Sequence, residues 1–215
     1  MKTFKYLLAV LGLFIGFAAQ PAAAQSAAEA PDVLIKRISQ QVLDIAKNDP
    51  QIQAGNYRRI MDVVEEHILP HVDFERMTAL AVGRYWREAT PEQQKRLTEE
   101  FRNLLVYTYS GAISQVKDQR VEFRPFRAAP DDTEVEVRSR VLQARGEPIQ
   151  LNYRLEKKAD GWKIYDVNVL GAWLVDSYRN TFASEIGKNG IDGLIGTLSE
   201  RNKRLAASAA KTAQP

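Results

Sequence analysis

The sequence predicts an α+β fold in which several helices cover one face of a curved, four-stranded antiparallel sheet. Three observations support this class. Apolar residues recur every three or four positions between residues 34 and 112, the spacing of helices buried on one side. They alternate with polar residues between positions 121 and 169, as in half-buried strands, and helical spacing returns beyond residue 173. No internal repeat divides the sequence, so a single domain over residues 25–205 is expected.

The first 24 residues predict a cleavable signal peptide. Lys2 and Lys5 precede an apolar run at 6–18, and Ala22-Ala23-Ala24 offers small residues to a signal peptidase. A membrane anchor is the alternative, but this run is short for a bilayer span. The mature protein is therefore expected to start at Gln25 and to be exported and soluble.

The next ninety residues predict helices with identifiable starts and stops. The first of these helices is expected to end at Asp49-Pro50. Asn56 and Asp73 are expected to cap the two helices that follow. A long helix is expected from Thr90, because a capping Thr, a Pro at the first position and Gln93 form a capping box. Its apolar stripe comprises Leu97, Phe101, Leu104, Leu105, Thr108 and Ala112.

Four antiparallel strands are expected at 121–124, 133–139, 151–157 and 162–169, with Asp160-Gly161 as the turn between the last two. One face of this sheet is apolar, which suits an NTF2-like cone with helices on that side. The other face carries Glu134, Glu136, Arg138, Gln150, Asn152, Arg154 and Glu156.

Two helices are expected after the sheet. The first presents a stripe of Leu174, Tyr178, Phe182 and Ile186. Gly190 is expected to end it, and Asp192 to cap the last helix. The small, polar tail at 206–215 is expected to be disordered.

Charge and cysteine content exclude several classes of protein. The formal charge of +3 falls to +1 once Lys2 and Lys5 are removed, because the signal segment contains no acid. A nearly neutral protein does not suit nucleic-acid binding or permanent adhesion to anionic lipid. The chain has no cysteine, so the core alone must hold the fold.

The residues needed for common catalytic and metal sites are missing from the sequence. His67 and His71 have a spacing that suits a metal, but Pro70 breaks the helix between them and no third ligand follows. There is no nucleophile elbow and no glycine-rich phosphate loop. No metal, cofactor or ATP site is therefore expected.

One enzymatic interpretation depends on Asp166. A cone-shaped fold can place an Asp and a Tyr in an apolar pocket, as ketosteroid isomerases do. Either Trp162 and Ile164 face inward together with Asp166, which buries the carboxylate, or Tyr165 and the valines after it face inward and Asp166 is solvated. The favoured interpretation is structural: Asp166 caps a helix near Gly171 or pairs with an arginine.

An unusual supply of aromatic and long aliphatic side chains is directed toward the space between helices and sheet. Periodicity alone favours ordinary core packing, and a pocket for an apolar ligand is the alternative. The residues concerned are Phe101, Leu104, Leu105, Tyr109, Tyr153, Leu155, Trp162, Ile164, Leu174, Tyr178 and Phe182.

Several blocks of sequence, taken in order, carry a family resemblance. They are GWKIYDVNV at 161–169, SYRNTFASEI at 177–186, and GIDGLI at 190–195 followed by Leu198 and Asn202. Residues 74–86 and the helix expected at 91–109 fit the same pattern. In these blocks the chain resembles the MlaC family, the periplasmic phospholipid-binding proteins also known as toluene-tolerance proteins.

The resemblance implies a periplasmic phospholipid carrier that maintains the lipid asymmetry of the outer membrane. The space between sheet and helices would be a cavity for acyl chains, and the eleven residues named above would line it. The carrier, a monomer, would shuttle lipid between an outer-membrane lipoprotein complex and an inner-membrane ABC transporter with an MCE-domain ring. Two alternatives stay open: an NTF2-like isomerase or hydratase acting on an apolar substrate, and a structural envelope protein with a filled core.

Overall fold

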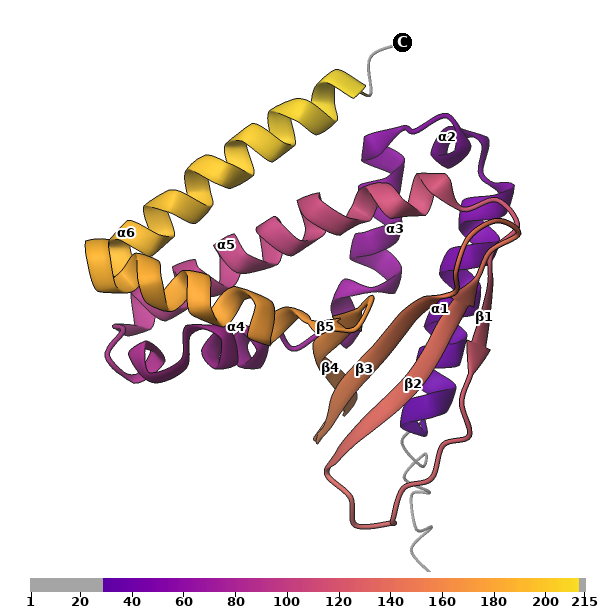
Figure 1. Ribbon diagram of the computed structural model, residues 1–215, viewed down its shortest axis with the longest axis horizontal. Coiled ribbons are helices and arrows are strands. Elements are labelled where there is room, and N and C mark those ends of the chain that lie inside the picture. The colour runs from indigo at the N-terminus through magenta and orange to yellow at the C-terminus, as the bar shows by residue number, and fades with distance from the viewer. Residues whose placement is uncertain (1–28, 213–215) are drawn as a thin grey trace, which may run out of the picture.

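The computed structural model describes residues 29–212, so the predicted signal peptide lies outside the described part of the chain. In Figure 1, α4, α5 and α6 form a layer of helices on one side, and an open sheet with α1 and α3 forms the other. The helices are α1 (Pro31–Asn48), α2 (Pro50–Gln53), α3 (Tyr57–His67), α4 (Phe74–Val82), α5 (Pro91–Tyr109) and α6 (Leu174–Thr212), with short 3₁₀ turns η1 (Leu69–His71), η2 (Gly83–Arg87) and η3 (Ser110–Gln115). None of these helices is long and apolar enough to cross a membrane.

The predicted helix starts are confirmed by their capping bonds. The Asn56 side chain accepts from Arg59 N at 3.2 Å, and that of Asp73 accepts from Arg76 N at 2.9 Å. At the start of α5, Gln93 N donates to Thr90 Oγ1 and Thr90 N donates to Gln93 Oε1, which completes the predicted capping box. These bonds satisfy N–H groups that the first turn of a helix leaves without partners.

The sheet is antiparallel, with strand order β1-β2-β3-β4-β5. The strands are β1 (Arg120–Phe123), β2 (Glu134–Leu142), β3 (Ile149–Lys158), β4 (Gly161–Val169) and β5 (Ala172–Trp173). Four of them match the predicted strands, and β5 is additional because two residues are too short to show alternation. We call the face that contains Val137, Tyr153 and Leu155 the inner face. The register places the predicted charged residues on the opposite, outer face.

A β-bulge in β4 changes which residues face inward. Arg154 pairs with Asp166 whereas Leu155 pairs with Ile164, so Tyr165 is the extra residue. A prediction from strict alternation misses such a one-residue shift. Both predicted alternatives for Asp166 are therefore partly wrong, because each gives the correct inward residues on one side of the bulge only. Ile164 before the bulge and Val167 after it pack on the inner face, while Asp166 lies on the outer face beside Arg154.

The C-terminal helix doubles back on itself (Figure 1). The backbone at Gly190 is non-helical, with φ of 71° and ψ of −179°, so the predicted boundary between two helices is correct. The Asp192 carboxylate accepts from Gln93 Nε2 at 3.1 Å, which joins the turn to the start of α5. Helical backbone extends to Thr212, whereas the composition predicted disorder from Ala206; alanine-rich sequence also favours helix.

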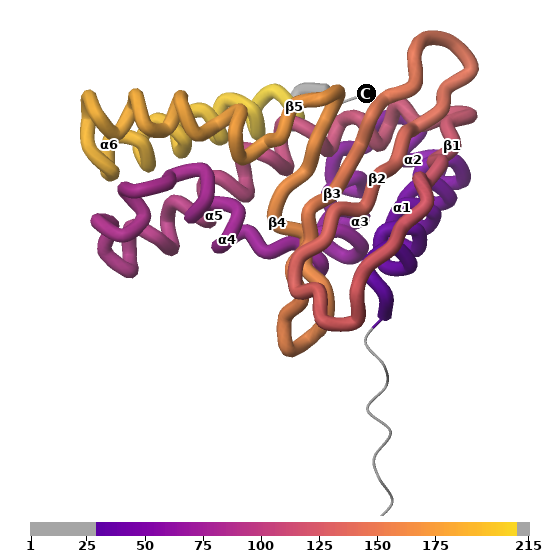
Figure 2. Tube along the Cα trace, turned by 60° about the horizontal axis from the view of Figure 1, so that its bottom comes forward, coloured from indigo at the N-terminus to yellow at the C-terminus, as the bar shows by residue number. Residues whose placement is uncertain are grey.

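Two hydrophobic clusters organise the space between the layers. The helical cluster joins α4, α5 and α6 around Leu97, Phe101 and Leu194. The sheet cluster joins α1 to the inner face through Leu34, Ile35 and Leu155. A third cluster packs α1, α2 and α3 against η3. In Figure 2, α1 lies along the sheet and the helical layer extends away from it.

Candidate functional site

The predicted lining residues divide between the two clusters instead of surrounding one space. Eight of the eleven are at most 8% exposed. The helical cluster contains Phe101, Leu104, Leu105, Leu174, Tyr178 and Phe182, and the sheet cluster contains Tyr153, Leu155, Trp162 and Ile164. Tyr109, at 39% exposed, stands at the edge of the helical layer. Most of these side chains therefore form walls, and few offer surface to a ligand.

The wall on the helical side is built from interlocked aromatic rings. The Phe101 ring packs edge-on against Tyr178 at 5.0 Å and against Phe182 at 5.1 Å between centroids. Such pairs add stabilisation beyond the area they bury and restrict the rings. Burial raises the pKa of the Tyr178 hydroxyl, and the neighbouring Tyr109 raises it further. This wall consequently presents a neutral surface.

The wall on the sheet side is closed by α1. Leu155, Trp162 and Ile164 are buried beneath Leu34 and Ile35 of that helix. Tyr153, two residues before Leu155 on the same face, is only half-buried as a residue. Burial raises the pKa of its hydroxyl to about 12, against a smaller opposing effect of hydrogen bonding with Ser39 and Ser139. Tyr153 is thus a neutral phenol at physiological pH.

The two walls meet at a junction that the sequence did not single out. Val72 and Val167 pack against both clusters. Asp73 N donates to Ile164 O at 2.8 Å, which ties the entry of α4 to β4. Beyond this point the inner face continues through the cross-strand pair of Leu151 and Val169, both half-buried. These residues show the same alternation as the predicted lining, and only their incomplete cover distinguishes them.

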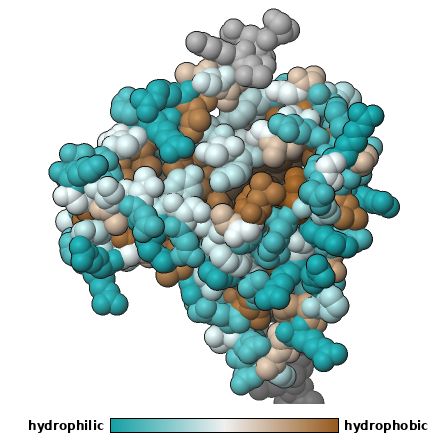
Figure 3. Space-filling model, viewed as in Figure 1, coloured by the Kyte–Doolittle hydropathy of each residue, from teal (hydrophilic) through white to brown (hydrophobic). Residues whose placement is uncertain are grey.

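Apolar surface is open to solvent at the middle of the molecule. Figure 3 shows apolar side chains gathered near the middle of this face, with polar side chains around them. We call the half-buried residues Leu151, Val167 and Val169 the open end of the inner face. An uncharged surface between neutral walls can receive an apolar ligand.

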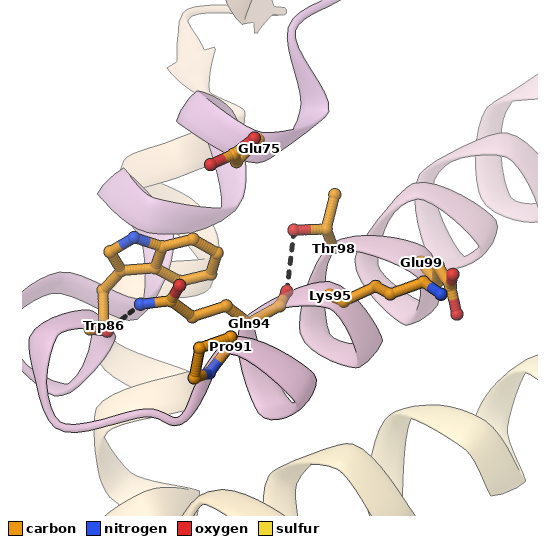
Figure 4. A pocket seen from close by; sticks show the side chains of 7 residues that line it. All are labelled: Glu75, Trp86, Pro91, Gln94, Lys95, Thr98 and Glu99. Carbon is orange, nitrogen blue, oxygen red and sulfur yellow. Dashed lines mark hydrogen bonds between the residues drawn. The ribbon is translucent and has the colours of Figure 1, made fainter.

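Two cavities among the described residues lie elsewhere, and most of the residues that line them are polar or charged. One, of about 390 Å³, is formed by α4, η2 and α5; its lining includes the Trp86 indole, Glu75 and Lys95 (Figure 4). The other, of about 540 Å³, lies around Asp49 and Arg59 near α2. Neither contains a residue of the predicted lining, and charged groups at both make them poor sites for acyl chains.

Asp166 has a structural role on the outer face. Its Oδ1 accepts from Val167 N at 2.9 Å and from Val175 N, in the first turn of α6, at 3.0 Å. Its other oxygen lies 3.4 Å from Arg154 Nη1. The favoured interpretation, helix capping and arginine pairing, is therefore correct. The sheet separates this carboxylate from the inner-face residues, so it cannot act with them on one substrate.

The described residues contain no group of three or more potential metal-ligating side chains. His67 ends α3 and His71 lies in η1, on the far side of Pro70 as the sequence predicted. Burial lowers the pKa of His71.

Comparisons with known proteins agree on one family. The sequence model of the MlaC protein family matches residues 36–200. The intermembrane phospholipid transport system binding protein MlaC of Haemophilus influenzae is 27% identical over 170 residues, covering 77% of this chain and 78% of that protein. The toluene tolerance protein ttg2D of Pseudomonas putida is 27% identical over 208 residues, covering 94% and 96%.

A solved structure extends the comparison to a bound ligand. The phospholipid-binding protein of Ralstonia solanacearum, solved in complex with a phospholipid, is 45% identical to this chain. The two superpose with a TM-score of 0.77, over 81% of this chain and 98% of the other.

Proposed function

Because this chain belongs to the MlaC family, we propose that it is a periplasmic phospholipid carrier that moves lipid between the inner and outer membranes. The observation that carries the proposal is the uncharged junction between the helical and sheet clusters, in a fold whose Ralstonia solanacearum relative was solved with a phospholipid. Acyl chains would enter along the open end of the inner face, and the eleven predicted side chains would form the surrounding walls.

The energetics of lipid transfer suit such a site. Burying a CH₂ group gains about 0.8 kcal/mol, so two acyl chains of about fifteen carbons need on the order of 20 kcal/mol of shelter from water. Neutral apolar walls supply that shelter, and the head group can remain in water. Lipid then moves between two apolar environments, so the exchange is close to balanced and its direction must come from the partners.

The finer assignments follow from the family. The protein would act as a monomer, start at Gln25 after removal of its signal peptide, and exchange lipid with an outer-membrane lipoprotein complex. At the inner membrane its partner would be an ABC transporter with an MCE-domain ring. The name of the Haemophilus influenzae relative, a binding protein of an intermembrane phospholipid transport system, supports the exchange of lipid between two membranes.

The proposal is tested by the lipid content of protein purified from the periplasm without detergent. Native mass spectrometry should show phospholipid at a defined stoichiometry, with mixed head groups, because the walls contain no convergent set of charged side chains. N-terminal sequencing of the same sample should begin at Gln25. An intact Met1 on a membrane-embedded product would contradict an exported carrier.

One observation favours a second candidate. Eight of the eleven predicted lining side chains are buried as in an ordinary core, which suits a structural envelope protein with a filled interior. Protein that is reproducibly empty of lipid, and that takes up none from vesicles, would support that candidate and reject the carrier.

A further inference from the structure

We propose that the turn between β4 and β5, with Leu170 at its tip, is the surface through which this protein contacts the phospholipid bilayer during lipid transfer. The inference rests on the proposed carrier function and adds a site of membrane contact to it. Its occupant is the apolar part of a lipid surface.

The turn is a two-residue hairpin with a fixed conformation. Val169 pairs with Ala172 across it, and Leu170 and Gly171 have φ of 54° and 91°. Positive φ at both central positions defines a type I′ turn, for which Asn-Gly is the preferred sequence. Leu170 N donates to Gln150 O at 3.0 Å, and Gly171 N donates to Asn168 Oδ1 at 3.0 Å. The tip is therefore held in place by hydrogen bonds.

Leucine is unfavourable at this position in two ways. It is the one described non-glycine residue with positive φ, a conformation that disfavours side chains with a Cβ. It is also 71% exposed, against 47% for Val33 and 39% for Tyr109, the other exposed large apolar residues of the described chain. An asparagine would relieve both problems. A single exposed apolar side chain is ordinary, but one held at a strained, positive φ points to a role outside the folded chain.

The location of the turn favours lipid as that contact. Val169, directly before Leu170, packs against the helical cluster, and its cross-strand partner Leu151 belongs to the open end of the inner face. The turn thus adjoins the proposed entrance for acyl chains, between the helical layer and the sheet (Figures 1 and 2). A tip that touches the bilayer would bring this entrance to the membrane surface.

The chemistry of the turn separates a bilayer from a protein partner. Residues 167–173 contain no charged side chain. At the base of the hairpin, the Trp173 ring lies 3.8 Å below the Arg154 guanidinium, and tryptophan is typical of the membrane interface. A specific protein interface needs about 800 Å² per partner with a polar rim, far more than one hairpin tip offers. A bilayer can accept a single apolar side chain.

The test compares three variants in transfer of a fluorescent phospholipid between vesicles of phosphatidylethanolamine and phosphatidylglycerol. Leu170→Asn keeps the turn conformation and removes the apolar tip, so transfer should slow about tenfold, as expected from losing the burial of one leucine. Leu170→Phe keeps an apolar tip and should transfer at close to the wild-type rate. Val33→Gln removes a different exposed apolar side chain, on α1, and should also transfer normally.

Lipid content and vesicle flotation decide the interpretation. The inference expects Leu170→Asn to carry as much co-purified lipid as the wild type, to melt no lower, and to float less with vesicles. Wild-type transfer by Leu170→Asn would overturn it. Loss of bound lipid would also overturn it, because the turn would then belong to the binding site. Slower transfer only when membrane proteins are present would assign the turn to a protein partner instead. Wild-type protein that is empty and moves no lipid would reject the carrier function itself.

Discussion

The two ends of the inner face carry the same kinds of side chain but differ in what covers them. At the closed end, Leu155 and Ile164 lie beneath α1 and are at most 5% exposed. At the open end, Leu151 and Val169 form a similar cross-strand pair that stays half-buried near the start of α6. Leu151 and Leu155 even share a strand and a face, four residues apart. The difference teaches that an apolar strand position becomes buried core or accessible surface according to the helix that covers it.

The largest effect is expected at the closed end. Leu155→Ala should lower the free energy of unfolding by about 3 kcal/mol, because the deleted methyl groups leave a cavity that α1 and the sheet cannot fill. The lipid carried per folded molecule should stay close to wild type. Denaturant unfolding measures the first quantity and lipid extraction the second. If Leu155→Ala were stable but empty, the closed end would belong to the binding site.

Leu151→Ala is the matched change at the open end. A half-buried leucine contributes less to the core, so we expect a loss of about 1 kcal/mol in unfolding free energy. Bound lipid should fall several-fold, since the deleted surface is the part available to acyl chains. The two alanine variants thus separate stability from binding in opposite directions. Equal effects of both on stability and on lipid content would mean that the two ends are not distinct.

The sequence predicted well which face of a helix or strand each side chain occupies, because that depends on local rules. The capping box at Thr90 set the start of α5, and alternation placed Arg154 and Glu156 on the outer face. The bulge at Tyr165 escaped detection, because one inserted residue leaves both halves of the strand with normal alternation.

Which of these side chains another element covers is less predictable, because it depends on contacts between segments far apart in the chain. The eleven predicted lining residues were chosen by periodicity, which includes Leu155 but cannot say that α1 lies above it. The same rule passed over Val167, whose importance arises only because the helical and sheet clusters both reach it. The uncovered part of the face, where we propose that lipid binds, thus became visible only when the layers were assembled.

Asp166 lies on the outer face, but its carboxylate holds the first turn of α6, the helix whose start lies near the open end. Its variants therefore test whether contacts on the outer face determine how well the open end is covered. Asp166→Ala removes that cap and should cost about 1 kcal/mol, whereas Asp166→Asn keeps an acceptor and should cost less. Burial raises the pKa of Asp166 despite the opposing Val175 N–H and Arg154.

The pH dependence of the Asp166 variants follows from that raised pKa. The folded state takes up a proton at a pH where the unfolded chain is still ionised, so this group adds stability as pH falls through its folded pKa, with no further gain below its unfolded pKa. Asp166→Asn should lack this gain, which thermal unfolding between pH 7 and pH 4 would measure. If the stability of the wild type and of Asp166→Asn changed with pH in the same way, the idea that this carboxylate titrates in the cap would be contradicted.

The smallest effect is expected from the charged contacts that join α4 to the outer face behind the closed end. Arg76 Nη2 lies 2.6 Å from Glu134 Oε1, its Nη1 lies 2.5 Å from Glu156 Oε1, and its guanidinium stacks 3.9 Å above the Tyr165 ring. Because Glu134 is half-exposed, water screens much of this attraction, and Arg76→Gln should cost no more than about 1 kcal/mol, less at high salt.

Acid titration sharpens this last test. The hydrogen bond from Arg76 lowers the pKa of Glu134, so its contribution is present above the unfolded pKa and is lost as pH falls through the lower, folded pKa. Arg76→Gln should reduce that acid-dependent loss. Arg138→Gln is the control, since Arg138 pairs with Glu136 on the same face at 65% side-chain exposure and should change neither stability nor pH profile. If Arg76→Gln instead lowered bound lipid as far as Leu151→Ala does, contacts on the outer face would control the open end. Burial on the inner face alone would then not explain the difference between the two ends.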